Sequence, residues 1–364
     1  MFKKVLSLML VLCMVFTLAA LTGCQDKDKS TDDKIKVGFI YVGPKNDGGW
    51  TEAHDIARQE LEKELGVETV YKESVPEEKG ECAKQIENLI SQGCNVIFTT
   101  SYGFMEATVE KAKEHPDVKF FHCSGDQRLD NLSTYFGRIE EPRYLSGIVA
   151  GLKTKSNKIG YVAAMQIPEV IRGINAFTLG VQSVNKDAKV IVKWSNTWID
   201  ETLEKEAAIA LLDEGCDVIA QHNDSTAPQL AAQERGAFAI GYDLDARDVA
   251  TKAYMTAPVF NWAPYYIDQV KAIMDGTWKS SDYLGGMKEG VVDLAELTEN
   301  APEGAKEKVE EVEKQIVDGK FTIFKGPLKD QSGTIRVEEG KEMTADEIWN
   351  MNWFIEGVEG KLDK

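Results

Sequence analysis

The chain alternates short apolar runs with longer amphipathic segments from residue 35 onward. Residues 35–42 (IKVGFIYV) predict a buried strand, and four later apolar runs predict further strands, at 67–74, 95–101, 118–124 and 133–139. A helical face follows the first strand, formed by Trp50, Ala53, Ala57, Leu61 and Leu65. Two more helices are predicted near 77–91 and 103–114. This alternation is typical of an α/β fold in which helices cover both faces of a parallel sheet.

The same pattern starts again 122 residues further along the chain. The segment KVGF at 36–39 is echoed by KIGY at 158–161. The segment LISQGCNVI at 89–97 is echoed by LLDEGCDVI at 211–219, at the same offset. Two matches at one offset predict two similar lobes, each with a helix that ends at a glycine before a buried strand.

Two Rossmann-like lobes predict a cleft between them. Ligands of open α/β sheets sit at the carboxyl ends of the strands, and closure about a hinge is the motion expected of two such lobes. Three crossings are expected to form a multi-strand hinge, at 140–157, 255–262 and 293–300. The first lobe is predicted to comprise 34–140 and 262–293, the second 157–255 and 300–335, and a C-terminal extension 336–364. Within the extension, 344–354 is predicted to form a helix docked on the outside.

The first 24 residues indicate export. Lys3 and Lys4 precede an apolar run from 5 to about 20, which is a few residues short of a comfortable membrane span. The run ends in Leu-Thr-Gly-Cys24, which resembles the lipobox of bacterial lipoproteins. The resemblance implies that 1–23 is a removed signal peptide and that a lipid on Cys24 anchors the protein to the cell membrane, outside the cytoplasm. An ordinary cleaved signal with a chance cysteine is the alternative.

The segment behind Cys24 is polar and charged, so 24–33 is predicted to be a flexible linker. Removing the signal takes Lys3 and Lys4 from the 42 basic residues, which leaves 40 against 60 acidic ones and a net charge of −20. This charge argues against binding to nucleic acid or to an anionic membrane surface, although solubility alone would also explain it. About 340 mature residues suit two domains better than one core.

The other cysteines of the mature chain indicate neither disulfides nor a metal site. Cys82 and Cys94 bracket a predicted helix and would lie about 18 Å apart at 1.5 Å per residue, too far for a bridge. Together with Cys123 and Cys216 they are interpreted as small buried hydrophobes, with a pair of disulfides as the alternative. Neither CxxC nor a Cys/His cluster with metal spacing occurs in the sequence.

The sequence offers little that would support catalysis. An enzyme needs a nucleophile with its base or a metal site, and neither GxSxG nor HExxH occurs. His54 and His115 are expected to be solvated, and His122 and His222 to be buried in strands with satisfied ring nitrogens. The protein is therefore predicted not to be an enzyme and to need no cofactor or metal.

Polar and aromatic residues gather where the predicted strands end. Aromatic faces with a few carboxylates and amides suit a flat heterocycle or a sugar. Trp50 follows Asn46 and Asp47 at the start of a helix, where core packing is the alternative to a role in the cleft. The residues expected in the cleft on these grounds are Asn46, Asp47, Trp50, Ser101, Tyr102, Trp198, Asn223, Asp224, Tyr242, Asp243 and Trp262.

Together these segments resemble the basic-membrane-protein (PnrA-like) family, whose members are substrate-binding lipoproteins of ABC importers. The resemblance rests on the lipobox and on FIYVGPKNDGGW, VIRGINAFTLGVQSVN, VIAQHNDS and GYDLD, and it runs from about 34 to 354. It implies the type I periplasmic-binding-protein fold, an ABC permease and ATPase as partners, and a purine held between two aromatic rings. Trp50 and Trp198 fall at the positions of these rings, and Asp243 falls on the acid that grips ribose hydroxyls in nucleoside binders. Asn175, in the second of these motifs, is also expected to bind the ligand.

One departure from the family pattern bears on the ligand. Nucleoside-binding members carry a lysine shortly after the hinge, where this chain has TAPVFNW at 256–262. The indole of Trp262 is expected to fill the ribose space, which favours a free base such as adenine. A nucleoside, a sugar or autoinducer, and a sensory rather than an importing role are the alternatives. The protein is expected to act as a monomer.

Overall fold

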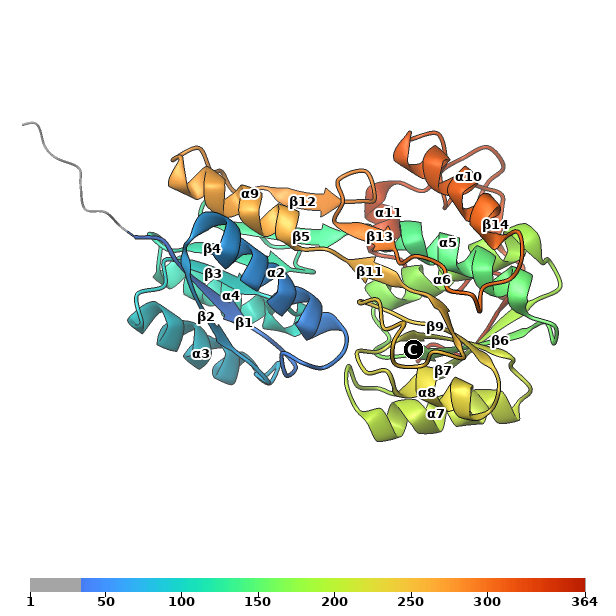
Figure 1. The fold of residues 1–364 in the computed structure, drawn as a ribbon. Coiled ribbons are helices and arrows are strands. Elements are labelled where there is room, and N and C mark those ends of the chain that lie inside the picture. Colours follow the sequence, from blue (N-terminus) through green and yellow to red (C-terminus); the bar gives the residue numbers. More distant parts are fainter. Residues whose placement is uncertain (1–33, 364) are drawn as a thin grey trace, which may run out of the picture. The chain divides into compact units, whose positions relative to one another are not determined.

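The computed structural model describes residues 34–363, so the signal peptide, Cys24 and the predicted linker lie outside the described residues. Two six-stranded sheets, each parallel throughout, form the framework of the described chain (Figure 1). The first has the order β12-β5-β4-β3-β1-β2, with β1 (Lys36–Ile40), β2 (Glu68–Lys72), β3 (Val96–Thr99), β4 (Lys119–Cys123), β5 (Leu132–Gly137) and β12 (Asp282–Gly285). The second has the order β10-β9-β8-β6-β7-β16, with β6 (Lys158–Ala163), β7 (Lys189–Trp194), β8 (Val218–His222), β9 (Phe238–Ile240), β10 (Tyr254–Thr256) and β16 (Val358–Glu359).

Helices cover both faces of the first sheet, as the alternating pattern predicted. Side chains of successive strand residues point to opposite faces, so Ile97 and Phe98 belong to different cores. Ile97 packs in a mainly aliphatic core beneath the helices at 79–91 and 105–114, whereas Phe98 packs with other rings beneath the helix at 263–274. The helices are α2 (Trp50–Leu65), α3 (Lys79–Ser91), the short 3₁₀ turn η1 (Tyr102–Phe104), α4 (Met105–Glu114) and α9 (Ala263–Met274).

The second sheet is covered in the same way. On one face α5 packs closely along α6, and α10 lies against α5. On the other face α7 packs against α8. The helices are α5 (Glu140–Lys153), α6 (Pro168–Val184), α7 (Glu201–Asp213), α8 (Ala227–Glu234) and α10 (Ala305–Val317).

The predicted internal repeat is confirmed at its most specific point. Gly93 and Gly215 have φ of 90° and 91°, left-handed values that a residue with a side chain rarely adopts. The cysteines that follow them donate backbone hydrogen bonds of 3.1 Å to Leu89 and Leu211 in the same way. Both cysteines are buried and free, as are Cys82 and Cys123, so the interpretation of all four as core residues is confirmed.

The crossings between the sheets differ in part from the prediction. Residues 140–157 were expected to form a hinge strand, but most of this stretch is helix α5, because its apolar residues recur at helical spacing and pack on α6. The other two crossings pair with each other. Strand β11 (Pro258–Phe260) follows β10 and precedes α9 along the chain, and β13 (Val292–Leu294) follows β12 and precedes α10. The two strands pair as a two-stranded antiparallel sheet.

The C-terminal extension joins the second sheet. The helix expected at 344–354 is confined to α11 (Ala345–Trp349), which a Thr344–Glu347 capping box begins. Asn175 then binds the irregular backbone that follows, through the Trp353 carbonyl (2.8 Å) and the Ile355 amide (3.1 Å). This pairing draws the chain into β16, at the edge of the sheet beside β7. A hairpin of β14 (Leu328–Lys329) and β15 (Ile335–Val337) precedes α11.

Candidate functional site

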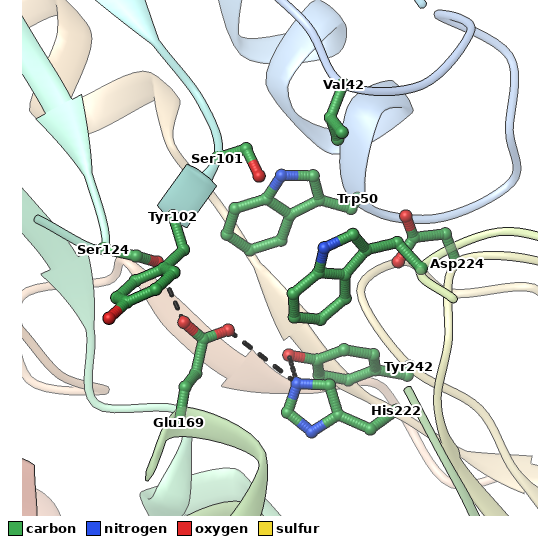
Figure 2. Close-up of a pocket in the computed structure, with 10 residues that line it drawn as sticks. Val42, Trp50, Ser101, Tyr102, Ser124, Glu169, His222, Asp224 and Tyr242 are labelled. Atoms are coloured by element: carbon green, nitrogen blue, oxygen red, sulfur yellow. Dashed lines mark hydrogen bonds and ion pairs between the residues drawn. The ribbon is translucent and has the colours of Figure 1, made fainter. Parts of the chain in front are cut away.

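A pocket lies where the strand-end loops of both sheets meet (Figure 2). The space between its walls measures about 350 Å³, a figure that includes space open to solvent. Its lining combines two indoles with carboxylates, hydroxyls and an imidazole. The lining residues are Val42, Trp50, Ser101, Tyr102, Ser124, Glu169, Trp198, His222, Asp224 and Tyr242.

The Trp50 ring is held by contacts with the protein interior and lines the pocket with its remaining surface. Asp47 caps the start of α2 by accepting backbone hydrogen bonds of 3.0 Å from Gly49 and 2.9 Å from Thr51, which fixes the turn that carries the indole. The indole N–H donates to the Thr100 carbonyl at 2.7 Å. His54 meets the ring edge-on at 4.6 Å between centroids, and only 8% of Trp50 is exposed. Trp50 thus serves both the core and the pocket.

Trp198 sits on a loop that the second lobe braces. Asn223 Nδ2 donates to Ser195 Oγ at 2.8 Å and to the Thr197 carbonyl at 3.1 Å. The Asp224 amide donates to the Trp198 carbonyl at 3.1 Å. The end of β8 therefore holds the loop after β7 in place, and Asn223 acts on the pocket through this loop.

A chain of polar groups forms one side of the pocket, with Glu169 at its centre (Figure 2). Ser124 Oγ donates to Glu169 at 2.9 Å, and His222 Nε2 lies 3.8 Å from the other carboxylate oxygen. Tyr242 Oη lies 3.1 Å from the same His222 nitrogen. Ser124 follows β4 of the first sheet, whereas the other members belong to the second, so the chain connects the two lobes.

The charge states of His222 and Glu169 follow from their surroundings. Burial and the nearby Arg143 guanidinium lower the pKa of His222 to about 4, so the imidazole is neutral at pH 7. Burial opposes ionisation of Glu169, but the nearby His222 imidazole, the charge of Arg172 and the hydrogen bond from Ser124 outweigh it and lower the pKa of Glu169. Glu169 is therefore a carboxylate at neutral pH and presents hydrogen-bond acceptors to the pocket.

Further buried carboxyl groups lie beside the pocket. Burial, together with the charges of Asp243 and Asp47, raises the pKa of Asp224 well above its ordinary value. Asp243 is fully buried at φ 66°, and within the described residues neither of its carboxyl oxygens has a hydrogen-bond partner. No lysine or arginine is among the described residues that line the pocket. The ionised Glu169 and the lack of a lysine or arginine among the described lining residues suit a ligand that donates hydrogen bonds and carries no negative charge.

Six of the residues expected in the cleft do line this pocket: Trp50, Ser101, Tyr102, Trp198, Asp224 and Tyr242. Six others do not, and their binding roles stay predictions. Asn46 is exposed, and Asp47, Asn223 and Asn175 are engaged in the backbone contacts described above. Asp243 is buried beneath the lining, and Trp262 stands behind Trp50, stacked between Phe260 (4.6 Å) and His54 (4.8 Å).

Four lining residues were not predicted from the sequence: Val42, Ser124, Glu169 and His222. Ser124 and His222 end or follow predicted strands, so their position alone would have placed them at this edge. Glu169 lies in the first turn of α6 directly after a strand-end loop, which is a comparable signal. His54, expected in solvent, is fully buried, because Trp262 covers its ring and Tyr266 Oη lies 2.5 Å from Nδ1.

Among residues 34–363, one group has ligand atoms close enough to hold a metal ion, formed by Glu87, Glu114 and His115. None of the three lines the pocket. The Lys111 ammonium group forms ion pairs with Glu87 at 3.0 Å and with Glu114 at 2.6 Å, so a side-chain cation already balances these carboxylates. None of the helices in this part of the chain is long and apolar enough to cross a membrane.

Comparison with known proteins places the chain. Residues 34–322 match the family model Bmp, described as ABC transporter substrate-binding protein PnrA-like. A purine-binding protein of Brucella abortus is 44% identical over 91% of this chain and 95% of its own. A Haloferax volcanii protein, whose name describes a glucose-binding protein of an ABC transporter, is 36% identical over 92% of this chain and 82% of its own.

A solved ABC transporter solute-binding protein from Aeropyrum pernix has the same fold, with a TM-score of 0.70 at 21% identity over 81% of this chain and 93% of its own. The predicted periplasmic-binding-protein fold is confirmed. Substrate-binding proteins of ABC transporters imply a small-molecule ligand, with permease and ATPase subunits as partners. With a family model that covers most of the sequence, the chain belongs to the Bmp family of PnrA-like ABC transporter substrate-binding proteins.

Proposed function

We propose that the protein captures a purine outside the cytoplasm, as a free base such as adenine, and presents it to an ABC permease and ATPase for import. The observation that carries this proposal is the pair of indoles, Trp50 and Trp198, that line one pocket from opposite lobes beside the Glu169 carboxylate. Aromatic faces stack on the flat base, and the carboxylate accepts from its ring N–H or its exocyclic amine. In this proposal the protein is a monomeric binding protein without catalytic function.

Two observations support a free base over a nucleoside. No lysine or arginine is among the described lining residues, whereas the nucleoside-binding members of the family that this chain resembles carry a lysine that reaches the sugar. The Brucella relative is named for purine binding. The indole of Trp262 does not support a free base by filling the ribose space, because it stands behind Trp50 and is not among the lining residues.

Calorimetric titration of the ligand-free protein with adenine, guanine, adenosine, guanosine and glucose tests the proposal. We expect a purine base to bind at least about tenfold more tightly than its own nucleoside. The sugar of the nucleoside replaces one ring N–H of the base, and a buried acceptor in the pocket that is left without this donor lowers the affinity. A nucleoside that binds more tightly than its base would show that the pocket accepts ribose. Tighter binding of glucose, for which the Haloferax relative is named, would replace the purine proposal with a sugar.

The lipid anchor is a separate part of the proposal. Leu21-Thr22-Gly23-Cys24 resembles a lipobox, and lipidation requires the thiol of Cys24. Changing Cys24→Ser is expected to move the protein from the membrane fraction to the soluble fraction on cell fractionation. Cys13→Ser, in the apolar part of the signal, is the matched control and should leave the protein in the membrane fraction. Retention of the Cys24→Ser protein on the membrane would contradict the lipobox.

A further inference from the structure

Glu77 is held firmly to the first lobe although it lies in a loop. It belongs to the segment between β2 and α3, and one carboxylate oxygen accepts from Ser101 Oγ at 2.5 Å and from the Gly103 amide at 3.0 Å. A side chain at 103 would leave no room for this arrangement, since a Cβ there would lie 2.6 Å from the Glu77 carboxyl carbon. Two donors and a fitted backbone therefore fix the direction of the carboxylate.

The second oxygen of Glu77 reaches the other lobe. It accepts a hydrogen bond of 3.3 Å from the indole N–H of Trp198, on the loop after β7. Trp198 has no other side-chain hydrogen-bond donor, so this contact determines how the indole ring is turned. Ser101 and Trp198 line the pocket and Glu77 does not, so the Glu77 carboxylate is not among the groups that the lining offers to a ligand.

We infer that Glu77 is a positioning residue that fastens the first lobe to Trp198 and so orients this ring for stacking when the lobes close. The inference rests on the proposed function in one respect, that Trp198 stacks on the ligand. It differs from the second cross-lobe contact, between Ser124 and Glu169 (2.9 Å), which lies in the lining and competes with the ligand for the same carboxylate. Glu77 therefore stabilises the closed state without that competition.

The variant Glu77→Gln isolates this contact. Its amide oxygen still accepts from Ser101 and Gly103, but its NH₂ group then faces the indole N–H, so two donors oppose each other. We expect adenine to dissociate about five- to tenfold faster, as for loss of a partly exposed hydrogen bond to a charged group, with a smaller change in association. Glu78→Gln, next in the same exposed loop and without a side-chain hydrogen bond at the start of α3, is the matched control and should leave both rates unchanged.

A double-mutant cycle separates positioning from a general effect of the loop. Trp198→Phe keeps an aromatic face and removes the N–H, so adding Glu77→Gln to it should have little further effect on dissociation. Equal effects of Glu77→Gln in both backgrounds would overturn the inference, as would a dissociation rate unchanged from the parent.

Hydrogen exchange of the ligand-free chain tests the contact without any purine. Gly49 packs against the Asp224 backbone across the pocket, so amides near these two residues report on lobe contact. We expect faster exchange at 49–52 and 222–226 in Glu77→Gln and unchanged exchange in Glu78→Gln. If adenine fails to bind the parent chain, the purine proposal fails, while unchanged exchange in Glu77→Gln would reject the role of Glu77 by itself.

Discussion

Removing the indole of Trp198 should weaken adenine binding by about tenfold to a hundredfold. Stacking a base on an aromatic ring is worth roughly 1–3 kcal/mol by alanine substitution, and each 1.4 kcal/mol is about a factor of ten in affinity. Trp198 is partly exposed on a loop that Asn223 and Asp224 brace independently, so Trp198→Ala should fold normally. Calorimetric titration measures the affinity, and the thermal midpoint of the ligand-free protein measures folding.

Trp194→Ala is the control for this experiment. Trp194 ends β7 in the same lobe, but its ring stacks on Phe354 at the far edge, and its N–H donates to the Lys361 carbonyl. It should therefore cost stability and leave affinity unchanged. Trp50→Ala should lower both the stability and the affinity for adenine, because Trp50 is only 8% exposed and also packs on His54. Parent-like affinity in Trp198→Ala would remove this ring from the binding site.

The sequence was most informative where backbone and core requirements are local. A helix that ends at a left-handed glycine before a buried strand needs the same residues in both lobes, so Gly93-Cys94 and Gly215-Cys216 revealed the repeat. The polar strand ends were equally local, because parallel strands bring their carboxyl ends to one edge. Asp224 and Tyr242 follow from that rule alone.

The errors concern contacts that depend on packing between distant segments. The place of Glu169 after a strand-end loop indicates this edge of the sheet, but no local pattern specifies that Glu169 meets Ser124 of the other lobe and His222 there. His54 lies in a predicted helix and was expected to face solvent because its side chain is polar. Trp262, more than 200 residues later in the sequence, stacks on its ring and covers it. The same stacking leaves Trp262 outside the pocket lining, although its position after a predicted strand, where nucleoside binders carry a lysine, had suggested a place in the cleft.

One of the three expected hinge segments was mislocated for a related reason. Residues 140–157 connect the two repeats, and a connection was expected to be extended. Their apolar residues instead follow helical spacing, and α5 buries them along α6. The sequence therefore carried the helix signal, and the expectation of a hinge strand overrode it.

Adding one methyl group at Gly49 should prevent full closure of the lobes. A Cβ at this position would lie 2.3 Å from the Asp224 carbonyl oxygen and 2.9 Å from its Cα, which are backbone atoms that no rotamer change can move. Overpacking of this kind costs about 1–3 kcal/mol, and the cost falls on the closed state alone, because separated lobes avoid the contact. Gly49→Ala should therefore lower adenine affinity by about tenfold to a hundredfold.

Solution scattering distinguishes this effect from loss of a binding group. Saturating adenine should reduce the radius of gyration of the parent chain and leave that of Gly49→Ala close to its ligand-free value. The matched control is Gly80→Ala, since a Cβ at this position in α3 would meet no atom within 4 Å. It should bind and close like the parent. If Gly49→Ala also closes and binds like the parent, the contact between Gly49 and Asp224 does not limit closure, and ligand capture does not require the lobes to approach as closely as they do in this structure.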